Sequence, residues 1–321
     1  MRLTTKIYRP NTAISIYEFL KRFPDEKSAR LYLEQSRWNG NIECPRCKST
    51  KIGKWGKNEG WHKCNNCKKP FNVKTNSIFE NSKIPLDKWF LAFYLMVTER
   101  KGISSVQISI KLGITQKSAW LMCQKAREAM GNCKNNYIFK GIVECDETYI
   151  GGKKRNRHSN KNVVKGRGSV GKIPVFGIVE RQGRTMSMVV PDTTKGTLQG
   201  IIRQNVQQGT VVNTDEWKSY IGLNGDYTHL TVNHSARQYK NGTASTNTIE
   251  SKWALAKRAY HGTFHHISPK HLQRYFDEID FRHNEGNGKI PTMCRIDSLI
   301  GGCWNGRLTY RKLVGNVAEG G

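Results

Sequence analysis

The sequence predicts a multidomain protein with a small cysteine-based metal module and a helical module, followed by an α/β domain with a mixed sheet. Four cysteines form two close pairs between residues 44 and 67. Residues 84–130 carry helical patterns, and residues 142–215 carry strand, hairpin, helix and strand patterns in that order. The chain has 321 residues, which is enough for two or three domains with their own cores.

The charge balance points to a polyanionic partner. Lys and Arg number 53 against 25 Asp and Glu, which gives a net charge of +28. Such a field attracts nucleic acid first and a membrane surface second. The longest apolar run, 89–97, is too short to span a bilayer, and the N-terminus lacks a signal-peptide pattern. We therefore expect a soluble, cytoplasmic protein without a membrane partner.

The cysteine pairs predict a structural zinc site. Cys44 and Cys47 enclose two residues, as do Cys64 and Cys67, and sixteen residues separate the pairs. Two such pairs complete a closed tetrahedral four-sulfur site for Zn²⁺. A thioredoxin-like redox pair is the alternative, but it leaves the second pair unexplained. The many lysines around the cysteines suggest contact with phosphate, although a merely solvated face also fits.

Residues 84–130 predict a helix-turn-helix. The pattern gives a helix over 104–112, a Gly113-Ile114 turn, a capping Thr115, and a longer helix over 116–130. Gln116 and Lys117 begin the second helix, which would enter the DNA major groove. The alternative is a three-helix packing unit without a DNA-binding role. Before these modules, one amphipathic helix capped by Asp25 is expected within residues 1–40.

Two predicted strands end in acids. Ile142, Val143 and Cys145 give a short β-prone run, and Asp146 and Glu147 interrupt it at its far end. A second strand, 210–215, ends in Asp215. A solvated edge strand with surface acids is the alternative. The elements expected between these strands are a flexible basic loop (153–172), a β-hairpin (176–190) and a helix (197–206).

A predicted helix over 246–260 carries a third acid. Its sheet-facing side comprises Ile249, Trp253, Ala256 and Tyr260. Asn247, Glu250 and Lys257 lie along the neighbouring face, and Glu250 and Lys257 point the same way because they are about two turns apart. A capping box of Asn247 and Glu250 is the alternative reading.

Together the acids predict a two-metal site. Acids at two strand ends and a third on a helix packed against that sheet provide the oxygen ligands of two divalent cations. Two Mg²⁺ ions, or Mn²⁺ in their place, are the expected cofactors for phosphoryl transfer.

Several segments resemble the bacterial insertion-sequence transposases related to Merlin transposons. The similar segments are 23–26, 44–47, 85–90, 146–152, 232–235, 247–253 and 260–272, which keep their order between about residue 18 and about residue 285. The resemblance implies a ribonuclease H-like catalytic domain of the DDE type, preceded by a zinc ribbon and a helix-turn-helix.

The same resemblance implies roles for individual residues. Asp146, Asp215 and Glu250 would be the three metal ligands, and Lys257 would contact DNA. Some relatives use an Asn as the third ligand, so Asn247 would be either an alternative third ligand or a residue that supports the ligands without binding the metal itself. Glu147 is a poorer candidate than Asp146, because neighbours on a strand face opposite ways.

The expected domains are a helical lead-in (1–40), the zinc ribbon (41–80), the helix-turn-helix domain (84–135), the catalytic domain (138–285) with its basic loop (153–172), and a C-terminal tail (286–321). The basic loop would add the DNA contacts Lys153, Lys154, Arg155 and Arg157.

The predicted function is cleavage at the ends of the protein's own mobile element and transfer of those ends into target DNA. The partners would be double-stranded DNA, both element ends and target, and further copies of the chain in a nucleoid-associated homo-oligomer. A DNA-binding regulator that no longer cleaves and a structure-specific nuclease that stops at hydrolysis are the alternatives.

Overall fold

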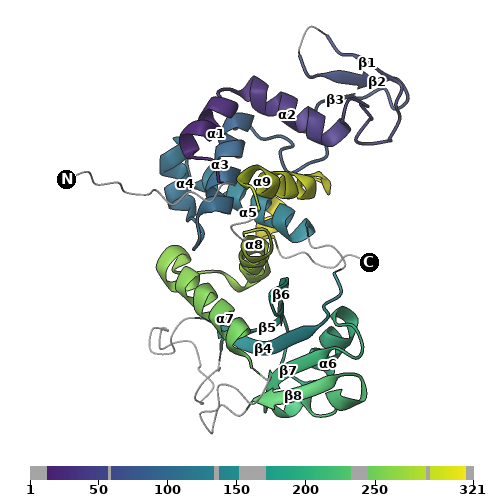
Figure 1. Ribbon diagram of the computed structural model, residues 1–321. Coiled ribbons are helices and arrows are strands. Elements are labelled where there is room, and N and C mark those ends of the chain that lie inside the picture. Colours follow the sequence, from purple (N-terminus) through teal and green to yellow (C-terminus); the bar gives the residue numbers. More distant parts are fainter. Residues whose placement is uncertain are drawn as a thin grey trace, which may run out of the picture. The chain divides into compact units, whose positions relative to one another are not determined.

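The computed structural model describes residues 13–56, 59–133, 137–151, 171–232, 245–286 and 290–315. The chain divides into two compact units (Figure 1). The first comprises Met1–Cys133 together with Glu285–Gly321, and the second comprises Lys134–Asn284. The second unit is thus inserted, as one continuous segment, into the sequence of the first. No described helix has both the length and the apolar character needed to cross a membrane.

The first unit contains a small sheet and a helical core. Its elements are α1 (Ile16–Arg22), α2 (Glu26–Trp38), β1 (Ile52–Lys54), β2 (His62–Cys64), β3 (Pro70–Phe71), α3 (Leu86–Thr98), α4 (Ser105–Leu112), α5 (Gln116–Asn132), α9 (Thr292–Gly301) and α10 (Tyr310–Val314). The three strands pair antiparallel in chain order. Asp25 caps α2 through Ser28, as expected.

Two details of the first unit differ from the sequence-based expectation. The N-terminal segment forms two helices rather than one, because Ser15 and Glu18 make a capping box for α1 and Phe19 packs against Tyr94. The segment after residue 285, for which no element was expected, forms α9. This last long helix packs against α2, α3 and α5, which come from the first part of the chain.

The helix pair α4 and α5 begins and ends as the local sequence dictates. Ser104 and Thr115 accept hydrogen bonds from the first turns of the two helices. Gly113 ends α4 with φ of 61°, a left-handed conformation that glycine adopts without steric cost. The predicted helices and the turn between them are therefore present in the structure.

The second unit is built on a mixed five-stranded sheet in the order β6-β5-β4-β7-β8 (Figure 1). Its elements are β4 (Ile142–Ile150), β5 (Ile173–Glu180), β6 (Thr185–Val189), α6 (Lys195–Asn205), β7 (Val211–Asp215), β8 (Thr228–Val232), α7 (Asn247–Ala259) and α8 (Leu272–Glu285). Strands β4, β5 and β6 pair antiparallel, whereas β7 is parallel to both β4 and β8. The predicted zinc-ribbon-like cluster, helices and mixed α/β sheet are confirmed, and the mixed sheet with helices is consistent with a ribonuclease H-like fold.

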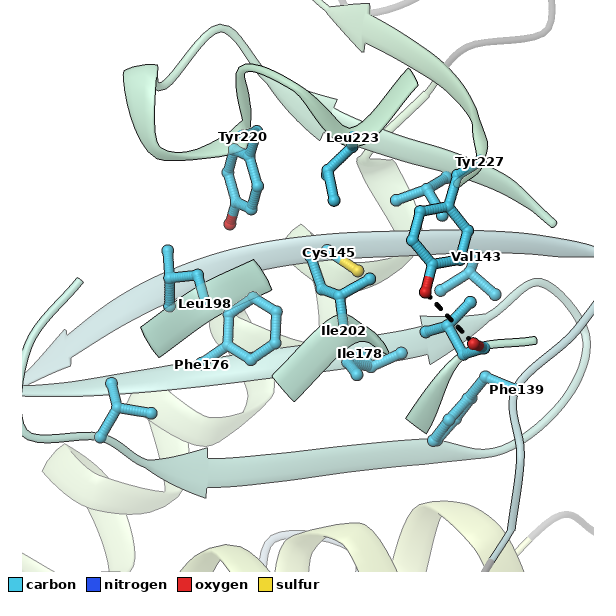
Figure 2. Packing of buried hydrophobic residues seen from close by; sticks show 13 residues of the cluster. Phe139, Val143, Cys145, Phe176, Ile178, Leu198, Ile202, Tyr220, Leu223 and Tyr227 are labelled. Atoms are coloured by element: carbon cyan, nitrogen blue, oxygen red, sulfur yellow. Dashed lines mark hydrogen bonds between the residues drawn. The ribbon is translucent and has the colours of Figure 1, made fainter. Parts of the chain in front are cut away.

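Helices cover both faces of this sheet. Figure 2 shows the core on one face, where α6 and the segments after β7 pack on Val143, Cys145, Phe176 and Ile178. The hydroxyl of Tyr227 donates to the carbonyl of Val206 at 3.3 Å across this core. On the other face α7 and α8 pack on Val175 and Val179. The predicted apolar face of α7 is confirmed, because Ile249, Trp253, Ala256 and Tyr260 all belong to that second core.

The expectation that Asp146 and Glu147 end the first strand is wrong. Strand β4 continues through both acids to Ile150, because β5 pairs with it along its whole length, with Asp146 opposite Gly177 and Glu147 opposite Phe176. What ends near the acids is the neighbouring strand β7, whose last residue is Asp215. The acids therefore lie in the middle of β4 but beside the end of its parallel partner.

Candidate active site and metal centre

The four predicted zinc ligands come together in the first unit. The sulfur atoms of Cys44, Cys47, Cys64 and Cys67 all lie within 4.8 Å of one another, and none of these cysteines is in a disulfide. A tetrahedral zinc with bonds of about 2.3 Å would place its sulfurs about 3.8 Å apart. The Cys44–Cys67 and Cys47–Cys64 sulfurs are 3.7 and 3.5 Å apart. The donor set therefore fits structural Zn²⁺, and the redox-pair alternative fails because both CxxC pairs contribute to one cluster.

The two cysteine pairs have the same local backbone geometry. Lys48 and Lys68, each directly after a CxxC pair, have φ of 60°, so both pairs lie in equivalent tight turns. The backbone N–H of Cys67 donates to the Cys64 sulfur at 3.5 Å. Such backbone N–H groups lower the pKa of the Cys64 thiol to about 6, which favours the thiolate that binds metal. His62 packs against Trp38 and Phe71 instead of joining the cluster.

In the second unit, strand register places Asp146 beside Asp215. Residues 142, 143 and 144 of β4 pair with residues 211, 212 and 213 of the parallel strand β7. Two residues further on, Asp146 and Asp215 are level, and side chains at equivalent positions of neighbouring strands face the same side. Both residues line a cavity of about 660 Å³, together with Glu147 and Lys257.

Helix α7 is fixed to this pair of acids through Trp253. The indole N–H of Trp253 donates to Asp146 Oδ2 at 3.0 Å. The indole reaches Asp146 because it lies over Gly177, where a Cβ atom would be 2.5 Å from the Trp253 ring. Glu250 lies three residues before Trp253, about one turn away on the same helix. One direct hydrogen bond thus links Asp146 to the helix that carries Glu250.

Glu250 is less closely gathered than the two aspartates. It lies outside the described lining of the cavity and accepts a hydrogen bond from Thr246 Oγ1 at 3.0 Å. Among the described residues, the cysteine cluster is the sole group of three or more potential ligands within 4.8 Å of one another. The charges of Asp215 and Glu250 nevertheless both raise the pKa of Asp146, so the three carboxylates interact electrostatically.

The capping-box alternative for Glu250 is not what forms. The residue before the helix is Thr246, not Asn247, and its side chain makes no capping hydrogen bond to the helix backbone. Asn247 is exposed at the first position of α7, where its backbone N–H donates to Ser245 Oγ. Lys257, two turns along from Glu250, is exposed and reaches the cavity.

Glu147 lies on the opposite face of β4 from Asp146, as the alternation of a strand predicts. Its carboxylate accepts a hydrogen bond from the hydroxyl of Tyr220 at 2.8 Å. Burial, followed by the charges of Asp146 and Asp215, raises its pKa to about 7, and the Tyr220 hydrogen bond opposes that rise. Glu147 nevertheless lines the same cavity as Asp146. This was not expected, because the two side chains point to opposite faces of β4.

The remaining predicted DNA contacts have different positions. Gln116 and Lys117 are exposed at the start of α5, and Gln116 donates to Ser105 Oγ at 3.0 Å. Lys153, Lys154, Arg155 and Arg157 lie outside the described residues.

The ionised carboxylate of Asp146 is expected to lower the free energy of unfolding. Burial, with the charges of Asp215 and Glu250, raises its pKa from 3.8 to about 7. The folded state therefore holds a proton that the unfolded state releases between about pH 4 and 7, and stability falls as pH rises through that window. In Mg²⁺-free buffer at pH 8, Asp146→Asn is expected to raise the unfolding free energy by about 2 kcal/mol.

Thermal unfolding of both proteins from pH 4 to pH 8 checks this expectation. Asp192→Asn is the control with the opposite sign. Hydrogen bonds from Thr194 and Thr197 lower the pKa of Asp192. Removal of this carboxylate in Asp192→Asn is therefore expected to destabilise the protein at neutral pH. An Asp146→Asn protein that is less stable than wild type at pH 8 would contradict the burial of an ionised carboxylate at this position.

Comparisons with known proteins match both the α/β domain and the segment that contains the cysteine cluster. Residues 138–284 match the model of the ISXO2-like transposase domain. Residues 24–70 match the model of the transposase zinc-ribbon domain. An uncharacterized transposase-like protein of Haemophilus influenzae is 32% identical over 114 residues, which are 35% of this chain and 89% of that protein. The chain belongs to the ISXO2-like transposase family.

A second relative extends over more of this transposase. An uncharacterized protein in transposable element ISH50 of Halobacterium salinarum is 29% identical over 253 residues, covering 74% of this chain and 84% of the relative. The resemblance to insertion-sequence transposases is thereby confirmed. The matched transposase domain contains Asp146, Asp215, Glu250 and Lys257.

Sequence reasoning missed the residues that support the acids of this transposase. Trp253 was assigned to the apolar core, where it does lie, but its indole N–H also serves Asp146. Glu144 was passed over, although it is two residues before Asp146 and so faces the same side of β4. That period-two spacing was the available signal. Tyr220 gave no comparable signal.

Proposed function

We propose that this transposase binds the terminal inverted repeats of its own insertion sequence, cuts DNA at those ends, and joins the freed ends to target DNA. The observation that carries the proposal is the side-by-side placement of Asp146 and Asp215 in one cavity, with α7 hydrogen-bonded to Asp146 through Trp253. Asp146, Asp215 and Glu250 are the proposed metal ligands, and Asn247 is the alternative for the third position.

The acidic cluster fits hard divalent cations. Carboxylate oxygens are the ligands that Mg²⁺ and Mn²⁺ prefer. Burial, and to a smaller extent the charges of Asp215 and Glu250, raise the pKa of Asp146, and a bound cation would compensate both effects. In a two-metal site the outer ligands need not touch each other, because the cations are about 4 Å apart. Asp146, which is influenced by both Asp215 and Glu250, is suited to be the ligand shared by both cations.

The chain's own residues would then position the DNA. When bound, the cations would activate the attacking oxygen and stabilise the leaving oxygen of the scissile phosphate. Lys257 and Lys172 border the cavity and would contact backbone phosphates. Trp217 is 51% exposed at the cavity, and its backbone N–H donates to Asp215 Oδ1 at 3.0 Å, which fixes its position beside that acid.

The first unit would supply recognition of the ends. In this proposal the zinc ribbon (41–80) and the helix-turn-helix (84–135) hold the repeat, with Gln116 and Lys117 toward the major groove, and the domain at 138–285 performs the chemistry. The basic loop with Lys153, Lys154, Arg155 and Arg157 would add further contacts to DNA. A homo-oligomer is proposed because two ends must be cut and joined together.

Incubation of the purified chain with an end-containing duplex and a target plasmid tests the proposal. In Mg²⁺ or Mn²⁺ we expect cut ends and joined target products. Joined products exclude a nuclease that stops at hydrolysis, and cut ends exclude a regulator that only binds. Binding of the end without any cleavage would refute the proposal.

Replacing Lys257 separates DNA contact from chemistry. Lys257→Ala is expected to raise the KM for the end duplex about tenfold with little change in kcat, because a charge-assisted phosphate contact is lost. The dependence of log binding on log salt should become shallower by about 1. Arg258→Ala is the matched control, since Arg258 is an adjacent exposed cation outside the described cavity lining. Equal effects of the two variants would contradict the assignment.

A further inference from the structure

The first three backbone N–H groups of α7 are satisfied from outside the helix, and the fourth makes the first bond of the regular helical pattern. Asn247 N–H donates to Ser245 Oγ at 3.2 Å, and Glu250 N–H donates to the carbonyl of Thr246 at 3.0 Å. The two between them, Thr248 and Ile249, both donate to Glu144 Oε2, at 2.8 and 3.0 Å. A side chain of the central strand β4 therefore replaces the missing side-chain cap of this helix.

Both carboxylate oxygens of Glu144 are occupied by hydrogen bonds. It is 0% exposed, and its other oxygen accepts from Thr248 Oγ1 at 3.0 Å and from the Arg181 guanidinium at 3.1 and 3.2 Å. A carboxylate at a helix N-terminus gains from the helix dipole, and the Arg181 charge compensates its burial. Five donors occupy its lone pairs, so Glu144 cannot also ligate a cation.

Glu144 is part of a row of contacts directly behind the acids. Its register partner on β7 is Asn213, whose Nδ2 donates to the carbonyl of Ser245 at 3.3 Å. Arg181 donates to the same carbonyl at 3.3 Å. Glu144 and Asn213 precede Asp146 and Asp215 by two residues each, so the segment that enters α7 is tied to the strands about 7 Å from the acid pair.

We infer that Glu144 is a positioning residue that sets the place of Glu250 relative to Asp146, and thereby the affinity for the divalent cations. Glu250 follows directly after the two residues whose N–H groups Glu144 holds. The inference rests on the proposed function. Loss of a supporting contact of this kind typically weakens metal affinity by about 10- to 100-fold.

Glu144→Gln tests the inference in the full-length protein. The amide keeps the size of the side chain but presents a donor toward Thr248, Ile249 or Arg181, so the first turn of α7 should shift. We expect the Mg²⁺ concentration for half-maximal cleavage to rise about tenfold or more. Tb³⁺ luminescence, excited through tryptophan, should show a similar loss of affinity without any need for catalysis.

Glu278→Gln is the matched control. Glu278 is also 0% exposed and paired with an arginine, Arg282, but it lies on α8, and its pairing with Arg282 is within that helix. Glu278→Gln should lower the melting temperature about as much as Glu144→Gln does. It should change the Mg²⁺ concentration for half-maximal cleavage and the Tb³⁺ affinity by less than about twofold. Should Glu144→Gln leave the metal readouts no more altered than Glu278→Gln does, the inference is overturned.

A milder variant keeps the test decisive if Glu144→Gln does not fold. Thr248→Val removes one of the five hydrogen bonds and keeps the side-chain shape, so a shift of about threefold in the same direction is expected. An unchanged Tb³⁺ affinity in this variant also counts against the inference. Failure of the proposed function would appear differently, as a wild-type protein that cuts no end duplex in Mg²⁺ or Mn²⁺.

Discussion

Asp146→Asn is expected to reduce DNA end cleavage by at least about three orders of magnitude, because a ligand shared by two cations is worth several kcal/mol of transition-state stabilisation. The amide can still accept the hydrogen bond from Trp253, so the fold and the position of α7 should be retained. Initial rates of strand nicking on an end-containing duplex, at saturating Mg²⁺, provide the measurement.

Glu216→Gln is the control for this loss. Glu216 is an exposed acid next to Asp215 and lies outside the described lining of the cavity. Its removal changes the local charge by the same amount, yet it should leave the nicking rate within about threefold of wild type because exposed charges interact weakly through water. Cleavage that survives Asp146→Asn would defeat the site assignment, whatever the behaviour of the control.

Cys64→Ser is expected to remove zinc and, with it, binding of the element ends. The four-sulfur cluster closes a sheet of only three short strands, so the ribbon has little other means of staying folded. Zinc content should fall from one per chain to near zero, and end binding should weaken by at least about tenfold as phosphate contacts are lost. Metal analysis and gel-shift titration measure the two effects.

Cys294→Ser is the matched control for the ribbon. Cys294 is exposed and lies outside the four-cysteine cluster. It should retain zinc and end binding. Tb³⁺ binding at the acidic cavity should be the same in both cysteine variants, since the cavity belongs to the other unit. Full end binding by zinc-free Cys64→Ser protein would contradict the proposed role of the ribbon.

Local patterns in the sequence were sufficient for much of the fold. The caps Asp25, Ser104 and Thr115 start helices where their side chains can accept backbone N–H groups. The CxxC pairs predicted the metal cluster, because tetrahedral thiolate chemistry dictates the spacing. The apolar face of α7 followed from helical periodicity, since one stripe must be buried against the sheet.

The errors arose where long-range pairing overrides local preference. Asp146 and Glu147 are poor strand residues, yet β5 pairs with β4 on both sides of them and holds the strand extended. The apparent capping box of Asn247 and Glu250 does not form, because Glu144, more than a hundred residues away in sequence, supplies the cap. No single-sequence pattern reports which distant carboxylate meets a given helix end.

The candidate site was predictable as a set of acids but not as an arrangement. The residue types and their places on two strands and a helix indicated oxygen ligands for cations. The contact of Trp253 with Asp146 depends on the bare backbone at Gly177, across the β4–β5 pairing. Such a contact requires three segments to be placed correctly at once, which periodicity alone does not provide.

The insertion of the second unit into the first has a consequence for synthesis of the protein on the ribosome. Helix α9 emerges last among the long helices, yet it packs on α2, α3 and α5, which emerge first. The nascent first unit must therefore wait, with part of its core uncovered, until the whole α/β unit has been translated. A prematurely terminated chain would lack α9, so completion of the first unit depends on prior synthesis of the second.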